Sequence, residues 1–171
     1  NALNPEAHHC LASIFDEFSS DANIQVAIIT GAGDKAFCSG SDLSVEDSLR
    51  RENLPLSGFG GIAERFDLIK PVIAAVNGDA IGGGLEIVLA CDLCVAARNA
   101  RFALPEPRVG LAASGGLHRL VRQIPEKLAK EIALTARMFS AEDAYRFGLA
   151  NILCETGSAL TQAILLANEI C

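Results

Sequence analysis

Residues 71–95, PVIAAVNGDAIGGGLEIVLACDLCV, contain the pattern that decides the fold. An apolar and partly β-branched run at 72–76 ends in an Asn-Gly pair, which is typical of a buried strand followed by a turn. A glycine triplet then precedes an apolar segment, Leu85 to Leu89, that we expect to be helical, and another strand candidate follows at 93–97. This alternation of strand and helix predicts an α/β protein with parallel strand pairing.

The sequence before this stretch predicts one helix, one strand and a surface loop. Asn4 is a suitable N-cap and Pro5 suits the first helical position, and apolar residues then recur along one helical stripe. The run VAIIT at 26–30 predicts a further buried strand. The segment 44–60, charged at first and then rich in proline, glycine and serine, predicts a surface loop that could close over a ligand.

Three more helices are expected after residue 97. Residues 117–124 have a helical pattern, Ser140 begins a short helix that ends at Gly148, and 159–170 is a last helical stretch. Before these segments, prolines flank Glu106 on both sides and make a helix at that position unfavourable.

Composition excludes several classes of partner. The formal net charge is −7 at pH 7, without the clustered lysine and arginine that nucleic acid or an anionic membrane would require. No apolar run approaches the roughly 20 residues of a membrane-spanning helix, and the first residues do not resemble an export signal. The six cysteines lie in apolar or small-residue stretches, which favours reduced thiols, no disulfides and a cytoplasmic location. Cys91 and Cys94 have no second C-x-x-C pair, which favours structural thiols over a metal site.

Three segments contain more glycine and more isolated charges than a plain core requires: KAFCSGSDL at 35–43, NGDAIGGGLE at 77–86 and FALPEPRVGLAASGG at 102–116. Glycines between a strand and a helix let backbone N–H groups approach a ligand, and a helix N-terminus favours an anion. Glu86 and Glu106 could then divide acid and base roles beside the anion. A helix-start acid and an ordinary exposed loop acid are the alternative interpretations of these two residues.

The segments KAFCSGSDL, PVIAAVNGDAIGGGLEIVLACDL and ARFALPEPRVGL resemble the signature of the enoyl-CoA hydratase/isomerase (crotonase) family in order, spacing and residue type. The resemblance runs from about Asn1 to the end of the chain. It implies the ClpP/crotonase-like α/β fold, in which repeated ββα units form a spiral core with surrounding helices. It also implies that residues 1–171 are a single catalytic domain without the family's first strand and C-terminal helical trimerisation region.

The same resemblance implies a site for an acyl-CoA thioester. Its thioester oxygen is expected in an oxyanion hole formed by the backbone N–H groups of Ser41 and Gly83. Glu86 is expected mainly to activate and position water, and Glu106 to transfer the proton at the α-carbon. The adenine and pantetheine of CoA are expected along Ala36, Ser39, Asp42 and Leu43. Asp42 is expected mainly to shape the turn.

The implied function is an enoyl-CoA hydratase or dehydratase, and the stretch from PVIAAVNG to PEPRVGL is most similar to the branch that includes carnitinyl-CoA dehydratase-like proteins. An isomerase or another enolate-forming enzyme, and a catalytically silent acyl-CoA-binding or scaffold protein, are the alternatives. The resemblance implies no metal and no cofactor beyond the CoA of the substrate, and homotrimers or dimers of trimers. The histidines at positions 8, 9 and 118 match no functional position of the family.

Two departures from the family pattern concern the site. Ser44 stands where a basic residue often approaches the CoA phosphates, and Lys35, Arg50, Arg51 or a neighbouring subunit is expected to take that role. The segment LAASGG is one residue shorter than the corresponding loop, which leaves open whether Ser114 supplies an amide that positions water.

Overall fold

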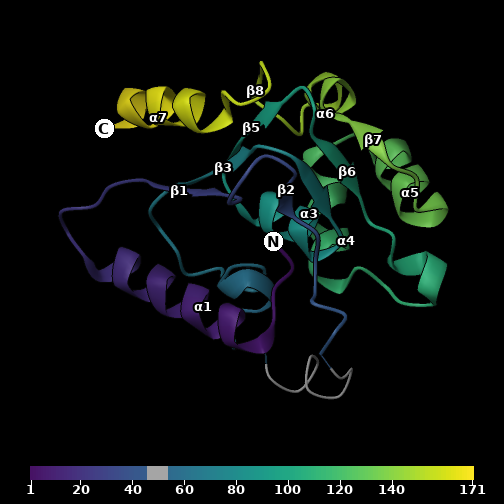
Figure 1. Cartoon of the computed structure of the whole chain (residues 1–171), viewed down its shortest axis with the longest axis horizontal. Coiled ribbons are helices and arrows are strands. Elements are labelled where there is room, and N and C mark those ends of the chain that lie inside the picture. The colour runs from purple at the N-terminus through teal and green to yellow at the C-terminus, as the bar shows by residue number, and fades with distance from the viewer. Residues whose placement is uncertain (46–53) are drawn as a thin grey trace.

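The computed structural model describes residues 1–45 and 54–171, and the strands in these ranges form two four-stranded sheets (Figure 1). The first sheet has the order β1-β3-β5-β8, formed by Ala27–Thr30, Val72–Val76, Leu93–Ala97 and Ile152–Cys154. The second has the order β2-β4-β6-β7, formed by Ala36–Cys38, Asp79–Ile81, Arg101–Ala103 and Phe139–Ser140. Neighbouring strands are parallel except β6 and β7, which pair antiparallel.

From β1 to β6, successive strands of the chain belong alternately to the two sheets. A turn at Asn77 and Gly78 separates β3 from β4, and helix α3 (Gly83–Ala90) follows β4. In the same way β5 and β6 precede helix α4 (Ser114–Gln123). The short 3-10 helix η2 (Glu106–Val109) lies between β6 and α4 in the chain. The chain therefore repeats a ββα unit, and the helices of the two units, α3 and α4, pack against each other.

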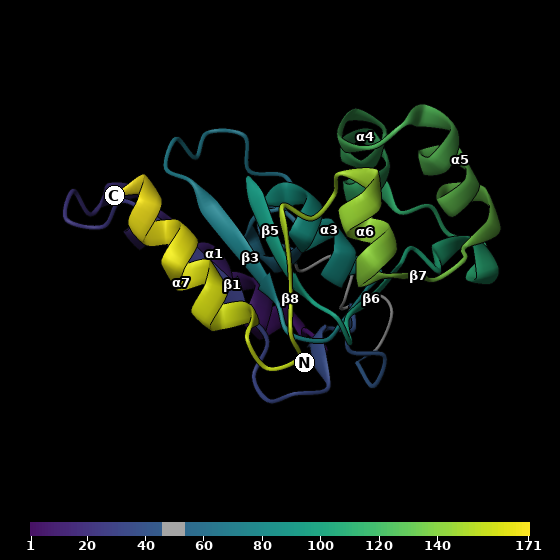
Figure 2. The ribbon, with the colours of Figure 1, turned by 90° about the horizontal axis from the view of Figure 1, so that it is seen from above.

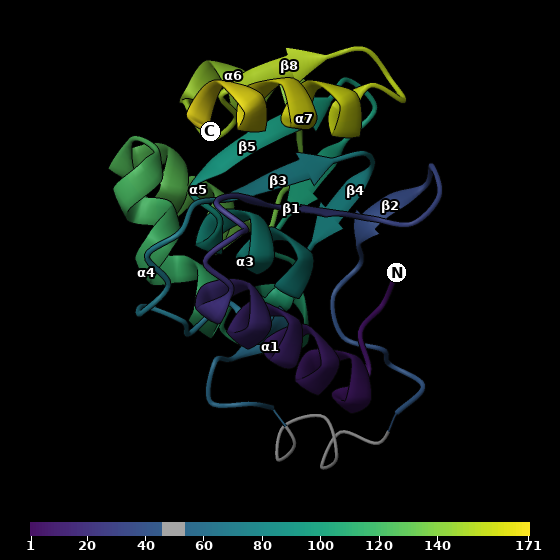
Figure 3. The same ribbon diagram turned by 90° about the vertical axis from the view of Figure 1, so that its left-hand side faces the viewer.

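Strand β3 is buried on both faces, which explains its continuous apolar sequence. Ile73 and Ala75 pack against Ala159 and Ala163 of helix α7 (Ala159–Ile170). The alternate residues of the strand face the larger core, to which helix α1 (Pro5–Ser20) contributes two buried phenylalanines. Figure 3 shows α7 on one side of the first sheet and α3 and α1 on the other.

The remaining helices, α4, α5 (Glu126–Thr135) and α6 (Ala141–Phe147), lie together on the side of the molecule away from α7 (Figure 2). Within the described residues, no helix is both long enough and apolar enough to cross a membrane. Cys91 and Cys94 are buried with free thiols, and burial raises the pKa of both, that of Cys94 to about 12. Such thiols are chemically inert.

Several helices and strands have the bounds predicted from the sequence, whereas others begin at a different residue or were not predicted. Strands β3 and β5 and helix α7 match their predicted ranges, and the Asn4 side chain caps α1 by accepting a hydrogen bond from the Ala7 N–H at 2.8 Å. Helix α4 begins at Ser114 rather than at 117, because its first turn consists of small residues that give no apolar signal. Helix α5 and the strands of two or three residues were not predicted.

The prediction of a surface loop over residues 44–60 is wrong for its last two residues, which are buried in a helical turn. Residues 46–53 lie outside the described ranges, but Phe59–Gly61 form a buried 3-10 helix, η1, between α1 and α3. Gly58, Gly60 and Gly61 all have positive φ angles, between 61° and 77°. Glycine adopts this backbone conformation without strain, so the turn can fold tightly into the core.

Candidate active site

A cavity of about 310 Å³ lies where four separate segments meet. The segment after β2, the turn η1, the start of α3 and the connection from η2 to α4 all contribute to it. It is lined by Ser41, Leu43, Leu54, Gly58, Phe59, Ala63, Glu64, Gly83, Glu86, Glu106, Leu111, Ala112, Ser114 and Gly115. The structure thus brings five of the eight residues predicted for the site to one place: Ser41, Leu43, Gly83, Glu86 and Glu106.

Two backbone N–H groups at this cavity are available to a ligand. Ser41 forms a parallel bridge with Leu3 in which the Leu3 N–H donates to the Gly40 carbonyl and the Asp42 N–H donates to the Leu3 carbonyl, both at 2.9 Å. The Ser41 N–H is not used by this bridge. Gly83 is the first residue of α3, where an N–H has no partner within the helix.

The two segments that carry these N–H groups are in close contact. A Cβ atom added to Gly40 would lie 3.6 Å from the Gly83 nitrogen, and one added to Gly84 would lie 2.0 Å from the carbonyl oxygen of Cys38. Residue 84 must therefore be glycine if the start of α3 is to contact the end of β2. The N-terminus of the helix adds the positive end of its dipole, so the arrangement suits an oxygen that becomes negative.

Glu86 is buried at this site, with 8% of its surface exposed. Its Oε1 accepts a hydrogen bond from the Gly115 N–H at 3.0 Å. The pKa of Glu86 is raised to about 7, chiefly by burial and then by the charges of Glu106 and Glu64, against the opposing effect of the Gly115 and Gly116 N–H groups at the start of α4. A carboxyl group with this pKa can accept or donate a proton near neutrality.

Glu106 also lines the cavity and is the first residue of η2. The prediction that its flanking prolines make a helix unfavourable is wrong for a 3-10 turn, because proline is tolerated in the first turn, where an N–H has no partner. Its Oε2 is buried and has no hydrogen-bond partner among the described residues. Burial raises the pKa of Glu106 above its ordinary value. An acceptor in this state is suited to a ligand or a water molecule.

The Ser114 amide, considered above as a donor that could position water, is not available for that role. The Ser114 N–H donates to the Ala112 carbonyl at 2.9 Å, so it is already used within the loop. The neighbouring Gly115 supplies the amide that holds Glu86, and a Cβ atom at Gly115 would lie 2.8 Å from Glu86 Oε2. Glycine at 115 thus allows the backbone to approach the carboxylate.

The residues predicted for CoA lie on the strand and turn that lead to the cavity. Ala36 is in β2, Ser39 is exposed, and Leu43 is exposed and lines the cavity mouth. The Asp42 Oδ1 accepts hydrogen bonds from the Ser44 N–H and hydroxyl at 2.9 and 2.7 Å, which is the turn-shaping role predicted for it. Ala36, Ser39 and Asp42 do not line the cavity. Of the proposed phosphate partners, Arg50 and Arg51 lie outside the described residues.

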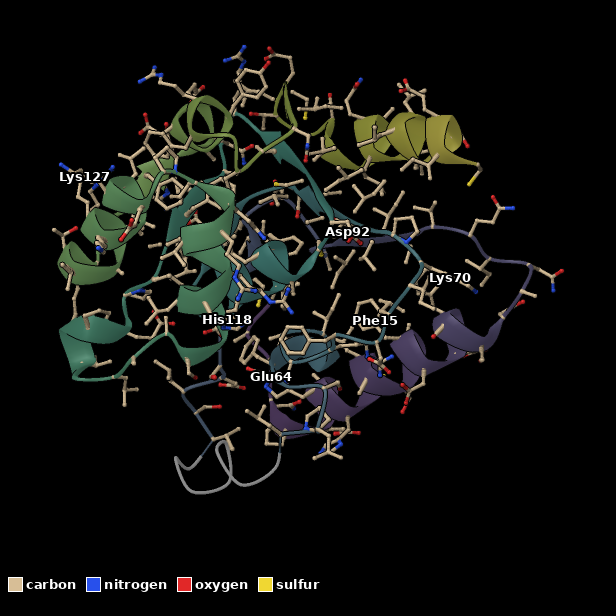
Figure 4. The ribbon with its side chains drawn as sticks, turned by 180° about the vertical axis from the view of Figure 1, so that it is seen from behind. Phe15, Glu64, Lys70, Asp92, His118 and Lys127 are labelled. Carbon is tan, nitrogen blue, oxygen red and sulfur yellow. The ribbon has the colours of Figure 1, made fainter. Side chains whose placement is uncertain are left out.

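Phe59 and Glu64 are among the cavity residues that the sequence did not reveal. The Phe59 ring lies against the start of α3, where a Cβ atom on Gly83 would be 2.4 Å from its Cε1. Glu64 is exposed and follows η1 (Figure 4). The only sequence feature that could have indicated them is their position in GFGGIAERF at 58–66, a few residues before the strand that leads to the glycine triplet.

Two N–H donors without a partner among the described residues and two carboxyl groups of raised pKa, carried by ββα units, define an enzyme-type site that can stabilise an anion next to proton-transfer groups. The chain belongs to the enoyl-CoA hydratase/isomerase family, whose model matches residues 1–171. This membership confirms the predicted fold class. No group of three metal-binding side chains is found in the parts of the chain that the structure describes.

Individual relatives support the same assignment. The chain is 40% identical to a carnitinyl-CoA dehydratase of Proteus mirabilis and 41% identical to one of Salmonella paratyphi A, in each case over 99% of this chain and 66% of the relative. An enoyl-CoA hydratase structure from Mycobacterium tuberculosis H37Rv superimposes with a TM-score of 0.92 at 44% identity. A carnitinyl-CoA hydratase structure from Mycobacterium avium does so with a TM-score of 0.92 at 41% identity, and both superpositions cover 99% of this chain and 66% of the other. The chain thus spans slightly less than two thirds of these relatives.

Proposed function

We propose that the protein is a hydratase or dehydratase that adds water to, or removes it from, the 2,3 bond of an acyl-CoA thioester. The observation that supports this most strongly is the presence of both Glu86 and Glu106, each with a raised pKa, in the cavity that the Ser41 and Gly83 N–H groups border. An isomerase needs one proton-transfer group beside the α- and γ-carbons, whereas hydration uses one group for water and one for carbon.

The proposed hydration begins with the thioester oxygen held by the Ser41 and Gly83 N–H groups. The Glu86 carboxylate takes a proton from water as the water oxygen bonds to the β-carbon, and the electron pair of the double bond moves toward the thioester oxygen. The protonated Glu106 then delivers its proton to the α-carbon as the enolate collapses, and a proton returns from Glu86 to Glu106 through water before the next cycle. Each N–H donor would stabilise the transition state by roughly 3 to 4 kcal/mol. Dehydration is the reverse, with Glu106 as base.

In this proposal CoA extends from the cavity along Leu43, Asp42, Ser39 and Ala36, and no other cofactor is required. The exposure of Ser39 and Leu43, on either side of Ser41, supports the placement. The protein is further proposed to act in the cytoplasm as a homotrimer or a dimer of trimers. Exposed apolar side chains around α5, including Val109, Leu134 and Met138, support self-association, which light scattering on the full chain would measure.

The test of the activity uses crotonyl-CoA and the full chain. Loss of the absorbance of the conjugated thioester, with a product heavier by one water molecule, is the expected result. Conversion of a 3-enoyl-CoA to its 2-enoyl isomer without any water adduct would favour the isomerase. Binding of CoA without turnover of either compound would favour the silent acyl-CoA-binding protein.

The acyl group that we propose carries a positive charge beyond the β-carbon. Three carboxylates line the cavity, Glu64, Glu86 and Glu106, and its lining contains no lysine, arginine or histidine among the described residues. The carnitinyl group named for the Proteus and Salmonella relatives carries a trimethylammonium group. Glu64, exposed at the cavity and without a salt bridge in the described residues, is placed to face such a cation.

This substrate proposal predicts a preference between two acyl groups of the same shape. The 4-trimethylammonio-2-butenoyl thioester should be hydrated with a higher kcat/KM than its uncharged carbon analogue, the 5,5-dimethyl-2-hexenoyl thioester. Glu64→Gln should reduce the ratio of the two values by about two- to fivefold, the factor expected for an exposed ion pair. Glu17→Gln, on the exposed surface of α1, is the control and should leave the ratio unchanged. An unchanged ratio in Glu64→Gln would contradict the role of this residue.

The raised pKa of Glu86 predicts the pH dependence of hydration. Because hydration requires the Glu86 carboxylate and a protonated Glu106, kcat/KM should rise as the pH approaches 7 and fall again at higher pH, where Glu106 loses its proton. Glu64→Gln removes one of the charges that raise this pKa, so the acidic limb of the profile should move to lower pH. A profile with its acidic limb near pH 4.5, the ordinary range of a glutamate, would contradict a buried base.

A further inference from the structure

His8 is a buried polar residue outside the cavity. It is the fourth residue of α1 and is 3% exposed, and among the described residues only His8 and Glu86 are polar or charged residues classed as buried. The neighbouring His9 is exposed. A buried imidazole requires a partner for at least one ring nitrogen, because an unpaired polar group costs free energy away from water.

The partner of His8 is the turn η1. Its Nδ1 accepts a hydrogen bond from the Gly60 N–H at 3.0 Å, and its ring meets the ring of Phe59 edge to face, with centroids 4.4 Å apart at 64°. Nδ1 can accept only when that nitrogen carries no proton. Burial lowers the pKa of His8 to about 4, with a smaller contribution from His9, so the ring is neutral at neutral pH.

The turn held by His8 fits closely between two helices. A Cβ atom on Gly61 would lie 2.4 Å from the Ala12 nitrogen of α1, and one on Gly60 would lie 2.6 Å from Ile87 Cδ1 of α3. The Phe59 ring in turn contacts Gly83, whose added Cβ would be 2.4 Å from the ring. A shift of η1 is therefore passed to the first residue of α3, where one proposed oxyanion N–H lies.

We propose that His8 is a positioning residue: by accepting the Gly60 N–H it fixes η1, and the Phe59 ring of that turn then holds Gly83 at the place where its N–H receives the thioester oxygen. This inference rests on the proposed function, since it assigns His8 an effect on the oxyanion hole. His8 itself does not line the cavity. Its effect should appear in the stabilisation of the transition state more than in binding of the ground state.

Two substitutions separate the hydrogen bond from the ring contact. His8→Phe retains a ring against Phe59 and removes the acceptor, whereas His8→Asn retains an acceptor near the position of Nδ1 and removes the ring. For hydration of crotonyl-CoA we expect His8→Phe to lower kcat about tenfold with KM changed less than twofold, and His8→Asn to remain within about threefold of wild type. His9→Phe, on the exposed face of the same helix, is the matched control.

Equal losses in His8→Phe and His8→Asn, or a wild-type kcat in His8→Phe, would overturn the proposal. If His8→Phe does not fold, the smaller His8→Leu takes its place. The amide resonance of Gly83 provides a readout without turnover: it should shift in His8→Phe and return toward its wild-type position in His8→Asn, and an unchanged resonance in both would also overturn the proposal. A wild-type protein without hydration activity would instead refute the proposed function, and the Gly83 resonance would still decide whether His8 positions this residue.

Discussion

Replacement of either Glu86 or Glu106 with glutamine is expected to lower kcat for hydration by about 10²- to 10⁴-fold, the contribution typical of a positioned acid or base. Glu86→Gln can still accept the hydrogen bond from the Gly115 N–H, and Glu106→Gln replaces a carboxyl oxygen that has no partner in the described residues. The loss should therefore come from proton transfer and not from a collapsed cavity. Initial rates with crotonyl-CoA and the mass of the product measure it.

The stability of Glu86→Gln provides an internal control for this result. The folded-state pKa of Glu86, about 7, lies above its ordinary value of 4.5, so its contribution to stability is present below pH 4.5 and is lost as the pH rises through 7. Glutamine does not ionise, so Glu86→Gln should melt at a higher temperature than wild type at pH 8 while being far less active. A lower melting temperature at pH 8 together with lost activity would show that Glu86 supports the fold instead.

Gly84→Ala is expected to damage both the fold and the site. The added Cβ would lie 2.0 Å from the Cys38 carbonyl oxygen, which is backbone and cannot rotate away as a side chain can. Overpacking of this kind costs about 3 kcal/mol, equivalent to a fall of roughly 6 to 12 °C in Tm for a chain of this size. Because the same displacement separates Gly83 from Ser41, kcat should fall at least about tenfold in the protein that remains folded.

Gly157→Ala is the control for this prediction. Gly157 has a φ of 85° and nothing within 4 Å of an added Cβ, so its substitution costs only the left-handed conformation, about 1 to 2 kcal/mol. It should retain the kcat of wild type at temperatures where both are folded. Thermal melts and rates below the transition separate the two effects. Wild-type activity and melting temperature in Gly84→Ala would contradict the contact between β2 and α3.

Those parts of the molecule that depend on local pattern could be predicted from the sequence. The apolar run of β3, the Asn4 cap of α1 and the end of α6 at Gly148 each have a signal within a few residues. The two glutamates and the two N–H residues were placed by their match to family motifs, and the structure brings all four to one cavity. Their catalytic roles stay predictions.

The remaining features depend on contacts between distant segments, for which a single sequence has no signal. The hydrogen bond between His8 and Gly60 joins residues 52 positions apart, and the glycines of η1 have the composition of an ordinary loop. Glu64 is an exposed acid, and its charge can raise the pKa of Glu86 only because η1 folds beside α3. The amide that holds Glu86 comes from Gly115 and not from Ser114, because the short loop uses the Ser114 N–H internally.

The central claim is that the Ser41 and Gly83 N–H groups polarise the thioester of a bound acyl-CoA. The most direct measurement is the stretching frequency of the thioester carbonyl, isotopically labelled, by Raman or infrared difference spectroscopy on crotonyl-CoA bound to Glu86→Gln, in which turnover is slow. The proposed site predicts a shift to lower frequency relative to crotonyl-CoA in water, because two backbone donors in a water-poor cavity weaken the carbonyl bond. A bound thioester with the frequency that it has in water would show that these N–H groups do not form an oxyanion hole.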